Sequence, residues 1–502
     1  MNYCIVLCLL LINLLAKGEV KDREQLILPH DIVTETQINH LDESLERMLF
    51  EEQEVPPLCY ALPGSTCPTE QITFAQTKDH TKTGKAKTLF MVYMSADNDL
   101  KIFAARNIRQ MALAGSNSNV SIVVHLDIRL NNNYKVTRRY LIEQNKITHL
   151  NAYDAVTQRM DSGDPKTLIS FCEFAVNTFP ADKNVLIFWN HGTGILDPER
   201  GRIIDPSALF VLNQETHKLD LDRRIGYLEA LERAYNDLRG VCWDDSTNNY
   251  LSNQKLIAAL SEICTRVLKG KKFDIIGFDA CLMSMLEVAN IMKNYAHIMV
   301  SSQEVELGTG WLYNGFLTPL TQRDMTPHEF ASNIVSVYDA TYKPVTEDYT
   351  LSAIDLQHMD HLEQKVNNVA ILLKECIKQQ NHNSVINSIK ASRNRLLCTH
   401  FDEPSYVDLH HLCGNLLTNM PHFSLQKSSQ NSQLLANLKQ ALTETRSKIE
   451  ESVFSYCAGA KLNKARGISI YFPEQFIFKS YPLSPFAQNY EWLSFLKTYL
   501  MS

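Results

Sequence analysis

The stretch Phe273-Asp-Ile-Ile-Gly-Phe-Asp-Ala-Cys-Leu-Met-Ser-Met-Leu-Glu-Val-Ala289 decides the fold class of this 502-residue chain. Five of its first six residues are apolar or glycine, a run too short for a helix and typical of a buried parallel strand. From Leu282 onward the apolar residues have the spacing of a helix that packs on one face. A strand that turns directly into a helix places Cys281 on the carboxyl edge of the sheet, where ligand crevices form in open α/β sheets.

This position gives Cys281 two interpretations. At a helix N-terminus a thiolate is stabilised by the dipole and by free N–H groups, which favours a nucleophile. Most single cysteines are instead small buried apolar residues. The position of Cys281 alone does not decide between these two interpretations.

Strand and helix patterns alternate through the first two thirds of the chain. The sequence predicts strands at residues 88–94, 119–127, 184–189, 273–279 and 297–302, and helices at 100–113, 165–178 and 253–268. Such alternation predicts a largely parallel sheet covered by helices on both faces. From residue 321 helical stretches mix with short strands, which indicates a smaller mixed C-terminal domain at 321–502 packed on an α/β domain at 85–320.

Composition describes an ordinary globular chain with 45% hydrophobic and 21% charged residues. The net charge of −7 gives no support to nucleic-acid binding, which usually needs a basic face. After residue 18 no segment has 18 uninterrupted apolar residues, so no membrane span is expected there.

The first 18 residues have the apolar core and the small residues of a cleaved secretory signal, with an uncleaved anchor as the alternative. We therefore expect a secreted or periplasmic protein. Residues 19–84 are either a pro-segment or a variable extension, and the sequence does not choose between them.

The cysteines are too sparse for a disulfide scaffold. Two of the twelve, Cys4 and Cys8, lie in the leader, so ten remain in about 480 residues. Cys59 and Cys67 could pair across a loop. No Cys/His cluster has zinc-ligand spacing, so no metal site of that kind is expected.

His191 directly follows the predicted strand at 184–189 and precedes Gly192-Thr-Gly194. It is therefore expected on the same sheet edge as Cys281, where an imidazole can activate a thiol. Without a side chain, Gly192 lets its N–H approach a substrate carbonyl and stabilise an oxyanion together with the N–H of Cys281. Taken alone, this histidine could be a strand-end residue and the glycines a turn.

Together the two strand ends, one in His-Gly and one in Asp-Ala-Cys, resemble the caspase-like clan of cysteine peptidases. Further short motifs resemble those of the clostripain family, and they occur in the family's order from about residue 85 to the C-terminus. They are Tyr93-Met-Ser-Ala-Asp-Asn-Asp-Leu100, Asn190-His-Gly-Thr-Gly194, Gly240-Val-Cys-Trp-Asp-Asp-Ser246, Gly308-Thr-Gly-Trp-Leu-Tyr313, Leu351-Ser-Ala-Ile-Asp-Leu356 and Arg466-Gly-Ile-Ser-Ile-Tyr-Phe-Pro473.

The resemblance implies a caspase-like α/β/α sandwich and a cysteine endopeptidase that acts through a His191/Cys281 dyad and an acyl-enzyme. It implies protein or peptide substrates, and we expect a monomer. No third catalytic residue is assigned. The alternative is an inactive secreted binding protein that keeps the fold.

The family resemblance also implies cleavage after Arg or Lys, with acidic groups in the pocket for that side chain. One such acid matches Asp279, which could equally be a strand-end residue bonded to backbone N–H groups. The second acidic residue commonly lies in a Gly-Asp-Gly-Trp motif, and this chain has Thr309 at the position of that Asp. Leu307 and Thr309 are nevertheless expected to contact the substrate.

Residues 195–239 form a charged insertion, and clostripain relatives are often activated by cleavage in this region. Arg202 or the Arg223-Arg224 pair would be the target for self-cleavage, whereas an uncut helical lid is the alternative. No cofactor is expected. Calcium is a weaker alternative, with Asp244 and Asp245 as candidates, because no EF-hand-type loop is present.

Overall fold

The computed structural model describes residues 45–47, 72–77, 84–130, 134–151, 159–196, 209–224, 226, 241–379 and 382–502. Residues 41–502 form one compact unit. The leader at 1–18, most of 19–84 and the pair Cys59 and Cys67 lie outside the described residues.

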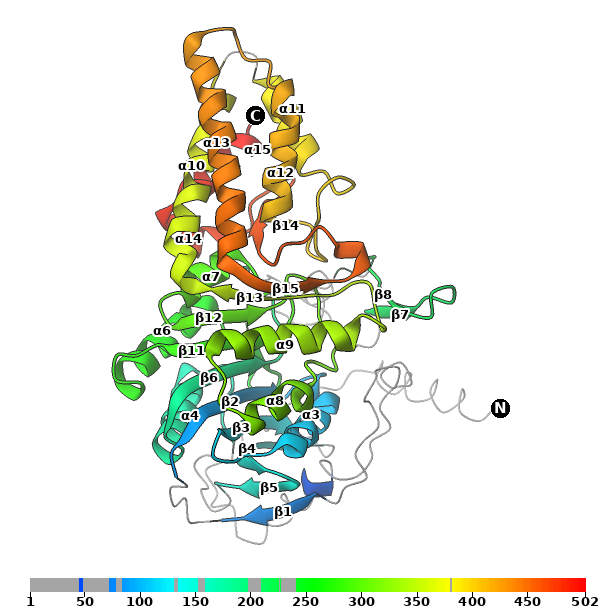
Figure 1. The fold of residues 1–502 in the computed structure, drawn as a ribbon, viewed down its shortest axis with the longest axis vertical. Helices are drawn as coiled ribbons and strands as arrows, with labels where there is room; N and C mark the ends of the chain where they lie inside the picture. The colour runs from blue at the N-terminus through cyan, green and yellow to red at the C-terminus, as the bar shows by residue number, and fades with distance from the viewer. Residues whose placement is uncertain are drawn as a thin grey trace, which may run out of the picture. The chain divides into compact units, whose positions relative to one another are not determined.

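A ten-stranded sheet runs through this unit (Figure 1). Its order is β1 (Thr73–Gln76), β5 (Lys146–His149), β4 (Lys135–Glu143), β3 (Val120–Arg129), β2 (Ala86–Ala96), β6 (Ala181–Trp189), β11 (Phe273–Asp279), β12 (Ala296–Ser301), β13 (Thr350–Asp355) and β15 (Val453–Ala458). The five central strands, β3 to β12, are parallel. Antiparallel pairs flank them on both sides. The predicted α/β class with a largely parallel sheet is confirmed.

Helices cover both faces of the sheet, as the alternation of side chains along β2 shows. Phe90 contacts the rings of Phe316 in α8 (Tyr313–Gln322) and Phe330 in α9 (Pro327–Tyr342). Tyr93, three residues on and so facing the opposite way, contacts Phe171 in α4 (Pro165–Thr178). The core is therefore built in three layers, as predicted for a caspase-like sandwich.

Two of these helices begin where the sequence carries clear start signals. Asp164 caps α4 by accepting from the N–H of Lys166, and Pro165 takes the first helical position, where a missing N–H costs nothing. Thr326 and Glu329 form a reciprocal capping box at the start of α9.

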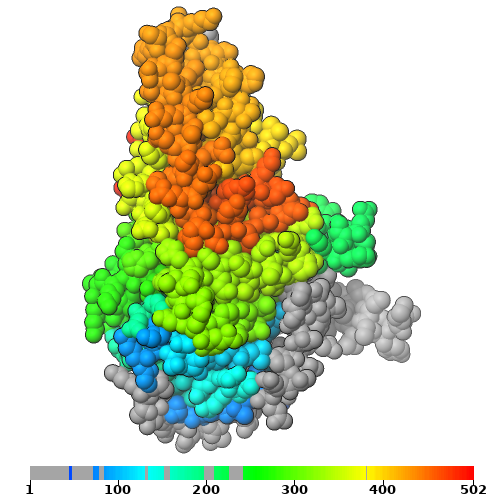
Figure 2. Space-filling model, in the orientation of Figure 1, coloured from blue at the N-terminus to red at the C-terminus, as the bar shows by residue number. Residues whose placement is uncertain are grey.

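The C-terminal region contributes to the same sheet. β13 and β15 lie beyond the domain boundary predicted at residue 320, yet they extend the sheet from β12. Beyond that edge, α10 (Met359–Ile377) packs against α13 (Ser429–Ser452) and α15 (Trp492–Leu500), and α12 (Leu409–Asn419) against α13 and α11 (Asn383–Ser392). Figure 2 shows β15 and its neighbours, in red-orange, lying directly on α9, in yellow-green.

One expected element is wrong. The helix after the Asp-Ala-Cys turn, α7 (Leu286–Met292), begins at Leu286 and not at Leu282. Leu282 has a positive φ of 63°, a conformation that costs a non-glycine residue about 1–2 kcal/mol. Its N–H donates to Glu304 O (3.2 Å), and that of Ser284 donates to Ser302 O (2.7 Å). Residues 280–285 are therefore held by the neighbouring loop as an irregular turn, although their apolar spacing resembles a helix.

No helix in the described ranges is both long and apolar enough to cross a membrane.

Candidate active site

Three parallel strands bring the predicted site residues to one edge of the sheet. Met94 in β2 and Asp279 in β11 both pair in register with Trp189, the last residue of β6. His191 and Cys281 each follow within two residues of these strand ends, so both leave the sheet at its carboxyl edge. This is the placement that the sequence predicts.

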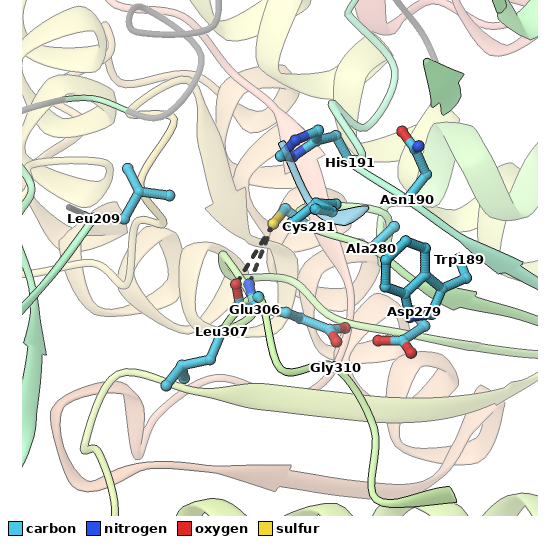
Figure 3. Close-up of a pocket in the computed structure, with 12 residues that line it drawn as sticks. Trp189, Asn190, His191, Leu209, Asp279, Ala280, Cys281, Glu306, Leu307 and Gly310 are labelled. Carbon is cyan, nitrogen blue, oxygen red and sulfur yellow. Dashed lines mark hydrogen bonds between the residues drawn. The ribbon is translucent and has the colours of Figure 1, made fainter. Parts of the chain in front are cut away.

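A hollow opens at this edge, and we call it the Cys281 hollow. Its lining includes His191, Asp279, Cys281, Glu306 and Leu307. Figure 3 shows the imidazole of His191 and the thiol of Cys281 among the side chains that line this hollow. Each of these two residues is only 7% exposed, so a bound peptide would displace most of the remaining water from them.

The thiol is held by a peptide N–H rather than by a helix N-terminus. The N–H of Glu306 donates to Cys281 Sγ at 3.3 Å, and Sγ lies 3.9 Å from the carbonyl oxygen of the same residue (Figure 3). Because α7 starts five residues after Cys281, the predicted contribution of its dipole is wrong. The N–H of Glu306 supplies an equivalent interaction, since a donor aimed at the sulfur stabilises its negative charge.

His191 has a carboxylate partner that the sequence analysis did not assign. Its Nε2 lies 2.6 Å from Asp99 Oδ1. A carboxylate can only accept, so Nε2 carries the proton and donates it to Asp99. Asp99 lies just beyond β2, next to β6 in the sheet, and its position after a strand end was the available signal.

The loop after His191 packs tightly against the Cys281 turn. A Cβ added to Gly192 would lie 2.4 Å from the carbonyl oxygen of Cys281, so only glycine allows this approach. Tyr406 from the C-terminal region clamps the same loop: its hydroxyl donates to Thr193 O (2.6 Å) and accepts from the N–H of Leu196 (3.2 Å).

Asp279 lies on the floor of the Cys281 hollow and is 5% exposed. Its Oδ2 accepts hydrogen bonds from the hydroxyl of Tyr313 (2.8 Å) and the N–H of Trp311 (3.3 Å). Gly310 has φ +63°, and a Cβ there would lie 2.8 Å from the same oxygen. Burial raises the pKa of Asp279 to about 6 despite these donors.

Glu306 is a second acid of the hollow that the sequence analysis did not select. It is 6% exposed, and its Oε2 accepts from the indole N–H of Trp311 at 3.0 Å. Burial, followed by the nearby charge of Asp279, raises the pKa of Glu306 well above its usual value. In Figure 3 the carboxyl groups of Glu306 and Asp279 point toward one another.

The loop after β12 carries Leu307 and Thr309, the two residues predicted to contact the substrate, and only one of them lines the hollow. Leu307 lines the Cys281 hollow. Thr309 does not belong to this lining, and its hydroxyl lies 3.0 Å from that of Tyr342 in α9. Its carbonyl oxygen accepts from Asn107 of α3 (Lys101–Ala114).

Part of the predicted insertion reaches the hollow, where Leu209 forms a portion of the wall. A hairpin of β7 (Phe210–Leu212) and β8 (Leu219–Leu221) follows, and then Arg223 pairs with Glu304 (2.7 Å) and Asp348 (3.1 Å). The neighbouring Arg224 is exposed and pairs with Asp222. Arg202 and most of the predicted lid lie outside the described residues, so cleavage here stays a prediction.

The two calcium candidates are already paired with cations. Asp244 and Asp127 both contact the buried ammonium of Lys135, and Asp245 pairs with Arg129 at 2.9 Å. Within the described ranges no group of three or more His, Cys, Asp or Glu residues is arranged to hold a metal ion. Calcium dependence stays a prediction.

Known proteins resemble this chain in sequence and in fold. A family model described as the clostripain family matches residues 92–205 and 229–499, which confirms the predicted resemblance. Clostripain of Hathewaya histolytica is 24% identical over 421 residues, covering 73% of this chain and 72% of that protein. The segment that carries Leu209 and Arg223 lies between the two matched ranges.

Two solved structures share the fold. A secreted C11 cysteine protease from Bacteroides thetaiotaomicron, in complex with an irreversible peptide inhibitor, has a TM-score of 0.50 at 19% identity and covers 82% of this chain and 99% of its own. An inactive zymogen C11 protease from Parabacteroides distasonis has a TM-score of 0.52 at 18% identity, with the same coverage of both chains.

Proposed function

Because the chain belongs to the clostripain family of cysteine endopeptidases, we propose that it hydrolyses peptide bonds through Cys281 and His191 and prefers Arg or Lys before the scissile bond. The observation that carries this proposal is the Cys281 hollow, which a thiol, an imidazole and two buried carboxyl groups line together. Protein or peptide substrates follow from the family.

The chemistry assigned to these residues is acyl transfer. The Cys281 thiolate attacks the scissile carbonyl carbon, and the resulting oxyanion accepts from the N–H groups of Gly192 and Cys281. As the C–N bond breaks, the leaving amine takes a proton from the imidazolium of His191. Water, deprotonated by His191, then hydrolyses the thioester and regenerates the thiolate.

Asp99 holds the imidazole for this task. Since Nε2 donates to Asp99, proton transfer is assigned to Nδ1. A carboxylate on the far nitrogen fixes the tautomer and the ring orientation, and it stabilises the imidazolium. Asp99 is therefore a positioning residue.

A peptide library with every residue varied at the position before the scissile bond tests this function. We expect cleavage after Arg and Lys to be at least about 100-fold faster than after neutral residues, because a buried carboxylate pairs with the cation. Absence of turnover on the whole library would favour the alternative, an inactive binding protein. Turnover without a basic preference would refute the assigned specificity and leave the peptidase activity intact.

We propose further that residues 1–18 direct export and are then removed. The apolar run and the small residues Ala16 and Gly18 support this. Expression in a secreting host should give a mature protein whose N-terminus, measured by Edman sequencing, starts directly after the leader. An intact Met1 on exported or membrane-bound protein would show an anchor instead.

A further inference from the structure

Two acids lie buried in the Cys281 hollow without a cation. Asp279 and Glu306 are 5% and 6% exposed, and no Lys, Arg or His of the described ranges forms an ion pair with either. Two other buried acids of the same ranges have such partners, since Glu304 pairs with Arg223 and Glu363 with Lys293. Within these ranges Glu287 is also buried without a cation, but it does not line the hollow. Burying a carboxylate without a partner is unfavourable, so this pair is well suited to receive a cation from outside the chain.

Trp311 orients both carboxyl groups. Its main-chain N–H donates to Asp279 Oδ2 at 3.3 Å, and its indole N–H donates to Glu306 Oε2 at 3.0 Å. The second oxygen of Glu306, Oε1, is buried and has no hydrogen-bond partner. The site is therefore built by fixed donors on one side, with an unsatisfied acceptor on the other.

We propose that Glu306 is the second specificity-determining acid of the pocket that receives Arg or Lys, and that it releases a proton when the cationic side chain enters. This inference rests on the proposed function, because it assumes that the peptide side chain before the scissile bond occupies the hollow. It assigns to residue 306 the role that the family pattern places at residue 309. The hydroxyl of Thr309 is directed instead to Tyr342.

Without a cation between them, the ionised forms of the two neighbouring carboxyl groups disfavour one another. Burial raises the pKa of both groups, and the charge of Asp279 raises that of Glu306 further. Both effects favour the protonated, uncharged form of Glu306 while no cation is bound. An entering cation favours the ionised form of both groups, so the proton leaves to solvent and the cation binds two carboxylates.

A second carboxylate suits a guanidinium, because its planar fork can donate to two acceptors at once. The position of Glu306 also sets the distance between the pocket and the nucleophile, since its own N–H donates to Cys281 Sγ. A side chain bound by Glu306 would thus place the adjoining carbonyl close to the thiol.

The test compares peptides that carry Arg or citrulline before the scissile bond, since citrulline has nearly the same shape without the charge. In Glu306→Gln, which keeps the size of the side chain, we expect the Arg-to-citrulline ratio of kcat/KM to fall about 10- to 30-fold. The citrulline rate should change less than about threefold. In the matched variant Thr309→Val the ratio should stay within about twofold of the wild type, because its side chain lies outside the lining.

The pH dependence of this ratio tests the proton release, because ionisations of Cys281 and His191 affect both peptides and cancel. In the wild type the ratio should rise with pH through two ionisations, and in Glu306→Gln through one. An unchanged ratio in Glu306→Gln, an equal loss on both peptides, or a single ionisation in the wild type would overturn the inference. A wild-type enzyme with no preference for Arg over citrulline would instead refute the proposed specificity itself.

Discussion

Replacing Cys281 by alanine is expected to lower peptide-bond hydrolysis by at least about 10⁴-fold, because no other group of the hollow can form the acyl-enzyme. The loss should appear in kcat, since substrate still enters the same pocket. Steady-state kinetics on a fluorogenic Arg peptide, with active-site titration of the wild type, measures it. The variant should keep its melting temperature within a few degrees, because Cys281 lies in a turn held by main-chain hydrogen bonds of its neighbours.

Cys376→Ala is the matched control. This cysteine is fully buried in α10, remote in sequence from the hollow, and it lines no part of it. Its replacement should cost about 1 kcal/mol of stability through lost packing and leave turnover within about twofold of the wild type. A Cys281→Ala enzyme that turned over as fast as Cys376→Ala would show that the nucleophile lies elsewhere.

Asp279→Asn is expected to lower kcat/KM for Arg and Lys peptides by about 10²- to 10³-fold, because a buried charge pair is lost while the shape of the pocket is kept. The amide still accepts from Tyr313 and Trp311, so the floor of the hollow should hold its geometry. The rate on a citrulline peptide should change little. Steady-state kinetics of Asp279→Asn and wild type on matched Arg and citrulline peptides measures both changes in kcat/KM.

The pH dependence follows from the raised pKa of Asp279. Because burial raises it to about 6, the carboxyl is protonated and uncharged at lower pH and cannot pair with a cation. The preference of the wild type for Arg over citrulline should therefore weaken as the pH falls through about 6. In Asp279→Asn this dependence should be reduced to the part that Glu306 supplies. An Asp279→Asn enzyme with the wild-type preference at every pH would exclude Asp279 from the pocket.

Much of this site could be predicted from local sequence. His191 and Cys281 each follow a short apolar run that forms a buried parallel strand, and parallel strands share one carboxyl edge. Their shared position at this edge can therefore be predicted without knowing the loop conformations. The start of α4 at Pro165 was equally predictable, because its cap and its proline are local signals.

The missed features depend on contacts between distant segments. Asp99 and Glu306 lie in polar loops where an acid is usually solvated, and only tertiary packing places them on His191 and beside Asp279. The prediction that a helix starts at Leu282 was wrong for the same reason. Hydrogen bonds to the main chain of Ser302 and Glu304 hold this segment as a turn, although its apolar residues have helical spacing. β4 was missed because polar residues interrupt its pattern, although all but its last residue pair with β3.

Covalent labelling tests the central claim most directly. Wild-type enzyme is treated with a peptidyl chloromethyl ketone that carries Arg next to the reactive group, and in parallel with its citrulline counterpart. Proteolytic mapping by mass spectrometry then locates the adduct. We predict one adduct, on Cys281, formed at least about 30-fold faster with Arg. An adduct on any other residue, or equal rates for the two reagents, would contradict a Cys281 nucleophile beside a pocket that selects cations.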